Sequence, residues 1–145
     1  MNERKPNLIP RNECEPGWLY RIDGRINDIG ICFVDITDKN ETKFLVQRTK
    51  FRSVFLDPEI HWDCDKRFGT AQPTVKIEKV PDHIWQLMMV DDKEVRPTYK
   101  MTLEESGVIL AYLNNHPAQI AINQEEEARW QAFLKREKEP THGTT

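Results

Sequence analysis

The chain has 145 residues, of which 38% are hydrophobic and 31% are charged, and its formal net charge is −3. This composition predicts a single folded domain and excludes a disordered chain, a polybasic protein that holds nucleic acid by charge alone, and a strongly acidic one. No apolar run approaches the roughly 18 residues of a membrane span, and no secretion signal follows Met1. We therefore expect a soluble cytoplasmic protein without a membrane partner.

The cysteines point to the same compartment. Cys14, Cys32 and Cys64 are three in number, widely spaced and without a CxxC pair. This pattern argues against a disulfide framework and against a structural zinc site. We expect free thiols, with Cys32 and Cys64 acting as small core residues.

The first half of the chain predicts an irregular arm followed by strands. Residues 1–16 hold three prolines and six charges without periodicity. From residue 17, short alternating or apolar runs are separated by turn residues, and the run at 31–36 predicts a central strand that is buried on both faces. The six predicted strands are WLYRIDGR, GICFVDI, KFLVQR, SVFL, EIHWDCD and TVKIEKV. Their number and spacing predict a small antiparallel barrel of SH3-like or OB-like type.

The second half predicts helices. Residues 82–90 fit either a helix or a strand, and we predict a strand that enters a hairpin at the turn 91–93. Thr102 and Glu105 form a capping box that opens a helix reaching about Asn114, with Pro117 soon after its end. Asn123 repeats the cap pattern with Glu126 and predicts the start of a second helix. The expected organisation is α+β: a β-rich domain at 17–100, C-terminal helices at 101–139 packed on it, and a disordered tail at 140–145.

The predicted strand at 59–65 carries the first candidate site. Glu59, His61, Asp63 and Asp65 occupy every second position, with Ile60, Trp62 and Cys64 between them. In a strand the four polar side chains share one face, where they could bind a divalent metal ion. With Lys66 nearby, His61 and Asp63 are the catalytic candidates of a metal-dependent hydrolase acting on a phosphate ester. The alternation fits equally well a half-buried strand with Trp62 in the core and a solvated face outside.

A basic segment carries the second candidate site. Lys43, Arg48, Lys50 and Arg52 alternate with Phe44 and Phe51, as in grooves that bind single-stranded nucleic acid. The rings fit a core equally well, and the cations fit a solvated edge.

The last predicted helix carries an apolar stripe of Trp130, Phe133 and Leu134. We expect this stripe to pack on the domain, and the alternative is a surface for a partner or for homodimer formation. His83 and His116 stand alone in the sequence and are interpreted as structural or exposed.

One resemblance concerns residues 17–73. The segments GRINDIGICF, LVQRTKF and FLDPEIHWDCDKRFGTAQP resemble a family of small uncharacterised phage and bacterial proteins. The shared patterns are Arg-x-Lys-Phe and E-x-H-W-D followed by F-G-T. Ile26 interrupts the family's Arg-Asn pair. The resemblance implies a mobile-element setting and no known activity.

No phosphate-binding loop, GxSxG or HExxH motif occurs, so no cofactor is expected. The leading hypothesis is a non-enzymatic binding or regulatory module that engages a host or phage protein or nucleic acid. The metal-dependent hydrolase is the alternative.

Overall fold

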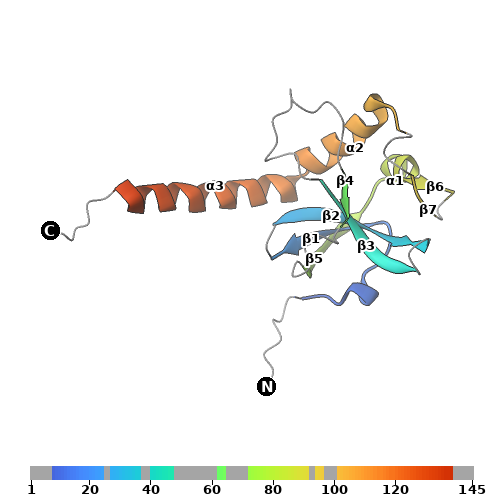
Figure 1. The fold of residues 1–145 in the computed structure, drawn as a ribbon, viewed down its shortest axis with the longest axis horizontal. Helices are drawn as coiled ribbons and strands as arrows, with labels where there is room; N and C mark the ends of the chain where they lie inside the picture. The colour runs from blue at the N-terminus through green and yellow to red at the C-terminus, as the bar shows by residue number, and fades with distance from the viewer. Residues whose placement is uncertain are drawn as a thin grey trace, which may run out of the picture.

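The protein has an α+β fold, as predicted. The structure is a computed structural model that describes residues 8–24, 27–36, 40–47, 62–64, 72–91, 94–96 and 101–138. Its elements in chain order are the 3-10 helix η1 (Arg11–Glu13), β1 (Trp18–Asp23), β2 (Asp28–Asp35), β3 (Glu41–Gln47), β4 (Trp62–Cys64), β5 (Gln72–Lys79), α1 (Asp82–Met88), β6 (Met89–Val90), β7 (Glu94–Val95), α2 (Leu103–Asn115) and α3 (Pro117–Lys138). Figure 1 shows the sheet below α1 and α2, with α3 extending far to one side.

The five-stranded sheet has the order β4-β3-β2-β1-β5, and all its neighbours are antiparallel. β2 lies at its centre, and the residues from Asp28 to Phe33 are all buried. This confirms the predicted central strand and its burial for residues 31–33, whereas Val34 and Asp35 are half-buried and Ile36, beyond the end of β2, is 49% exposed. The β2–β3 hairpin was also predicted correctly, and Asn40 takes a positive φ of 61° in its turn.

Gly30 allows close packing at the middle of β2. A Cβ atom at this position would lie 2.7 Å from Ile22 Cδ1 and 3.1 Å from Val46 Cγ2. Side chains from the two flanking strands, β1 and β3, therefore occupy the space that a larger residue at position 30 would need.

The predicted barrel closure is not found. Within the described residues the sheet is open, with β4 and β5 as its two edges. Closure would require a hydrogen-bonded ladder between the first and last strands. Pro73, which removes a backbone donor, lies in the edge strand β5, where such a residue is tolerated.

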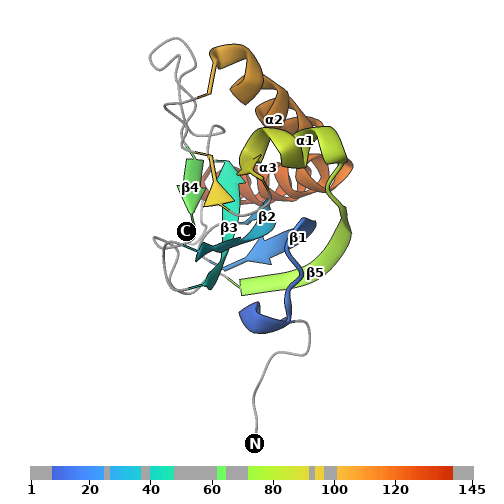
Figure 2. The same ribbon diagram turned by 90° about the vertical axis from the view of Figure 1, so that its right-hand side faces the viewer.

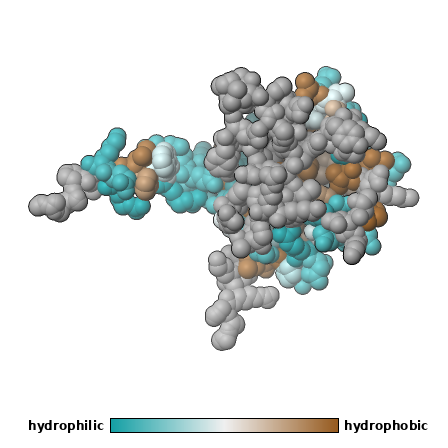
Figure 3. Space-filling model, viewed as in Figure 1, coloured by the Kyte–Doolittle hydropathy of each residue, from teal (hydrophilic) through white to brown (hydrophobic). Residues whose placement is uncertain are grey.

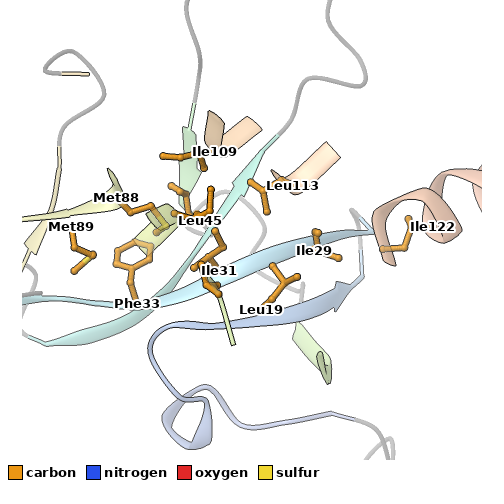
Figure 4. Close-up of a cluster of buried hydrophobic side chains, with 12 residues drawn as sticks. Leu19, Ile29, Ile31, Phe33, Leu45, Met88, Met89, Ile109, Leu113 and Ile122 are labelled. Carbon is orange, nitrogen blue, oxygen red and sulfur yellow. The ribbon is translucent and has the colours of Figure 1, made fainter. Parts of the chain in front are cut away.

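Helices cover one face of the sheet. Figure 4 shows the core between them, which contains Leu19, Ile29, Ile31, Phe33, Leu45, Val80, Ile84, Met88, Met89, Ile109, Leu113 and Ile122. The sheet supplies the first five of these residues, and α1, α2 and the start of α3 supply most of the others. Burying this apolar surface is the main driving force that attaches the helices to the sheet.

The N-terminal segment covers the opposite face (Figure 2). A second buried cluster lies there and contains Cys14, Tyr20, Ile22, Cys32, Phe44 and Val46. Ile9 packs against it and donates its N–H to the carbonyl of Pro73 at 2.9 Å. The described part of the predicted irregular arm is therefore a layer of the fold, because a sheet with two apolar faces needs a cover on each.

Two of the three cysteines belong to this second cluster and are free thiols. Burial raises the pKa of Cys32 to about 12, so that this thiol stays protonated. Cys32 is thus the small core residue that was predicted. The side chain of Cys64 lies outside the described residues.

The predicted strand at 82–90 is wrong except for its last two residues. Residues 82–88 form α1, and a short β6–β7 hairpin follows it, as predicted for the turn at 91–93. Ile84 and Met88 are four residues apart, a spacing that shares a face in a helix and in a strand alike. The helix is distinguished by Trp85 and Leu87, which also pack against the core.

The capping box of α2 is confirmed. The Thr102 hydroxyl accepts the Glu105 N–H at 3.0 Å, and a Glu105 carboxylate oxygen accepts the Thr102 N–H at 3.0 Å. The predicted start of the last helix at Asn123 is wrong, because α3 begins at Pro117. Proline suits the first position of a helix, where its missing N–H has no helical partner to lose.

Candidate functional site

The predicted metal site lies mostly outside the described residues. Residues 62–64 form β4, in agreement with a strand, and Asp63 pairs in register with Val46 of β3. Glu59, His61, Asp65 and Lys66 are not among the described residues. In the part of the chain that is described, no group of three or more His, Cys, Asp or Glu residues is placed to hold a metal ion.

Two residues of the predicted nucleic-acid site, one cation and one aromatic ring, are buried. Lys43 is only 3% exposed, and its Nζ atom pairs with Asp35 Oδ2 at 2.9 Å. Phe44 is fully buried in the second cluster. The burial and the ion pair contradict a phosphate contact at Lys43. Arg48, Lys50 and Arg52 lie outside the described residues.

Two residues of the predicted apolar stripe of α3 are exposed rather than packed on the domain, and the third, Leu134, is half-buried. Trp130 is 53% exposed and Phe133 is 41% exposed. In Figure 1 the second part of α3 extends away from the sheet and from α2, and Figure 3 shows a hydrophobic patch on it between hydrophilic stretches. The alternative interpretation of this stripe, as a surface available to a partner, therefore fits the structure. We call Trp130, Phe133 and Leu134 the α3 surface.

The two aromatic side chains of the α3 surface, Trp130 and Phe133, are stacked. Their ring centroids are 5.4 Å apart and the ring planes differ by 22°, which is a stacked arrangement. Both side chains remain exposed in this stacked arrangement. Acidic residues precede the pair along α3 and basic residues follow it, at Glu125, Glu126, Glu127, Lys135, Arg136 and Lys138.

The direction of α3 is fixed at its first turn. His116 Nδ1 accepts the Ala118 N–H at 3.0 Å, which satisfies one of the free donors at the start of the helix. This bond leaves the proton of the neutral imidazole on Nε2, which lies 3.2 Å from Glu78 Oε1 on β5. His116 therefore links the start of α3 to the edge of the sheet.

A buried amide contributes a second anchor. Gln119 Oε1 accepts the Ile29 N–H at 3.1 Å, while Gln119 Nε2 donates to Asp28 Oδ1 at 3.2 Å and to Asn123 Oδ1 at 3.0 Å. Asp28 and Gln119 are 2% and 6% exposed. The sequence carried no local signal for this network, because Asp28 and Gln119 are 91 positions apart.

A third anchor joins α3 to β1 by charge. Arg21 Nη2 lies 3.0 Å from Glu125 Oε1, and Arg21 Nε lies 3.0 Å from Asp23 Oδ1. The hydrogen bond from Arg21 lowers the pKa of Glu125. Beyond Glu125, every residue of α3 is half-buried or exposed.

The cluster of Glu78, Tyr112 and His116 has the residue types of an acid–base site, and sequence analysis missed it. The Tyr112 hydroxyl donates to Glu78 Oε2 at 3.0 Å, and burial together with that bond raises the pKa of Tyr112. A hydroxyl held in its protonated form is a poor base at neutral pH. His116 uses its two ring nitrogens in structural bonds, so the cluster is best explained as the joint between β5, α2 and α3.

Within the described residues, no helix has both the length and the apolar character to cross a membrane. No protein-family model matches the chain, and no curated protein and no solved structure shows significant similarity to it. The resemblance of residues 17–73 to small phage and bacterial proteins thus stays a prediction. The α3 surface is the candidate functional site on its geometry alone.

Proposed function

We propose that this protein is a non-enzymatic binding module that engages an amphipathic helix of a partner protein through the α3 surface. The observation that carries the proposal is the stacked pair of Trp130 and Phe133, which is exposed on a helix that leaves the domain. Aromatic residues dominate the energetic centres of protein interfaces because they bury a large area for few rotatable bonds.

The environment of α3 supports the same proposal. Isolated helices of about 12 to 15 residues are marginal in water, and most helical stability in proteins comes from packing. Residues 126–138 gain little packing from the domain. A partner that covers Trp130 and Phe133 would supply the missing contacts, as helices do when they bind along an apolar face.

The setting of the module follows from the other predictions. The resemblance of residues 17–73 suggests a phage or mobile element, so that the partner would be a host or phage protein. Free thiols at Cys14 and Cys32 support the cytoplasm as the compartment in which it acts. A partner protein is favoured over nucleic acid because Lys43 and Phe44 are buried.

The test is direct binding with purified components. Proteins captured by the full chain are identified, purified and titrated against wild type and against the double variant Trp130→Ser/Phe133→Ser by calorimetry. The matched control is Ile36→Ser/Val90→Ser, which removes two side chains of comparable exposure (49% and 39%) that lie outside α3. We expect the α3 variant to lose binding by at least about tenfold and the control to retain it. Equal binding by both variants would exclude the α3 surface.

A further inference from the structure

We propose that the partner helix on the α3 surface is α3 of a second copy of this chain, running antiparallel to the first. This inference rests on the proposed function and names its partner. The argument comes from the order of residues along one face of α3 and from the charges on either side of the aromatic pair.

One face of α3 is buried against the domain in the first part of the helix and exposed in the second part. Residues spaced by three or four positions share a helix face, and on α3 this line runs through Gln119, Ile122, Glu126, Trp130, Phe133 and Glu137. The first two are buried against the domain, and Trp130 and Phe133 are exposed. The face that attaches the helix to the sheet therefore continues beyond the domain without a cover from the described residues.

The charges around the pair are arranged in two blocks of mainly opposite sign, interrupted by Arg129 on the acidic side and Glu137 on the basic side. Three carboxylates stand at Glu125, Glu126 and Glu127, before Trp130. Three cations stand at Lys135, Arg136 and Lys138, after Phe133. A parallel pair of α3 helices would place carboxylate beside carboxylate and cation beside cation, which is destabilising.

An antiparallel pair reverses this outcome. With Trp130 of each copy beside Phe133 of the other, Glu127 comes within one turn of Lys138 along one side of the aromatic face. On the other side Glu125, which also pairs with Arg21 of its own domain, comes within one turn of Arg136. The acidic block of each helix then meets the basic block of the other, and the helix dipoles also oppose each other favourably. One facing pair is unfavourable, because Glu126 comes level with Glu137.

Self-complementarity is what identifies the occupant. A twofold contact between identical chains requires one patch that fits its own image. The order acid, aromatic pair, base has this property when the chain direction is reversed, so a second copy satisfies it except where Glu126 faces Glu137. Two such helix faces bury on the order of 1,000 Å², which is the lower end of specific interfaces, so the dimer is expected to be weak and concentration-dependent.

The first experiment measures the mass of the full chain by sedimentation velocity over a wide range of concentrations. We expect wild type to pass from monomer to dimer as its concentration rises, and Trp130→Ser/Phe133→Ser to stay monomeric with an unchanged circular dichroism spectrum of the domain. A wild type that is monomeric at every concentration overturns the second-copy inference. If that monomer still binds a purified partner through Trp130 and Phe133, the proposed function stands; if the double variant dimerises like wild type, the α3 surface is excluded for both.

The second experiment tests the antiparallel direction. Glu137→Lys places a cation level with Glu126 of the other copy. The dissociation constant of an antiparallel dimer should therefore fall at least about tenfold. In a parallel dimer residue 137 faces its own equivalent, and two lysines would repel as two glutamates do. Glu13→Lys on η1 makes the same change in net charge away from α3 and controls for general charge effects. No gain in Glu137→Lys, or an equal gain in Glu13→Lys, contradicts the antiparallel arrangement.

Discussion

The two parts of α3 have the same secondary structure and very different surroundings. Residues 117–125 are attached to the domain by Ile122, by the Gln119 network and by the Arg21–Glu125 ion pair. Residues 126–138 carry the larger side chains Trp130 and Phe133, and these remain exposed. The difference shows that the size of an apolar side chain does not decide its burial. Burial on α3 requires both a position over the sheet and the face that points toward it, because Ile120, in the first part of the helix, is 43% exposed.

The largest contrast is expected between two apolar residues of the same helix face. Ile122→Ala should lower the free energy of unfolding by about 2 to 5 kcal/mol, because Ile122 is fully buried and its loss leaves a cavity. Phe133→Ala removes more atoms but should change it by no more than about 0.5 kcal/mol in the monomer. Urea denaturation at low protein concentration measures both. Similar losses in the two variants would mean that the second part of α3 packs on the domain.

Two amides provide a contrast of intermediate size. Gln119→Ala removes the acceptor of the Ile29 N–H and a donor to Asp28, and should cost about 1 to 3 kcal/mol because buried polar groups lose their bonds. Gln131→Ala removes an exposed bond to Glu127 and should cost no more than about 0.5 kcal/mol. The same denaturation experiment applies. A neutral Gln119→Ala would show that the network does not anchor α3.

The smallest effect concerns pH at the boundary between the two parts. The hydrogen bond from Arg21 lowers the folded-state pKa of Glu125 below its ordinary value of 4.5. A lowered folded-state pKa contributes stability above the unfolded value and loses it as pH falls through the folded value. Glu125→Gln should therefore be less stable than wild type at neutral pH, and the difference should shrink in acid well below pH 4.5.

The control for this pH effect is the partner of the ion pair. In an Arg21→Met background, Glu125→Gln should no longer produce the pH-dependent difference, because the lowered pKa depends mainly on Arg21. A difference that persists in this background would assign it to another group.

The sequence predicted those features that depend on neighbours along the chain. The apolar run of β2, the β2–β3 hairpin and the Thr102–Glu105 capping box were all predicted correctly. Each is set by side chains within a few positions of one another. The α3 surface was also found as a pattern, because its spacing is a property of the helix itself.

Only the tertiary structure determined which of these side chains are buried and which are exposed. Lys43 looked like a cation available to phosphate, but it is buried beside Asp35. Residues 82–88 form a helix rather than a strand because Trp85 and Leu87 also find room in the core. Trp130 and Phe133 extend beyond the sheet because α3 begins at Pro117 and is fixed there by contacts with β1, β2 and β5. Periodicity and caps are local, whereas burial depends on which distant segments reach the same place, and that is determined only when the whole chain has folded.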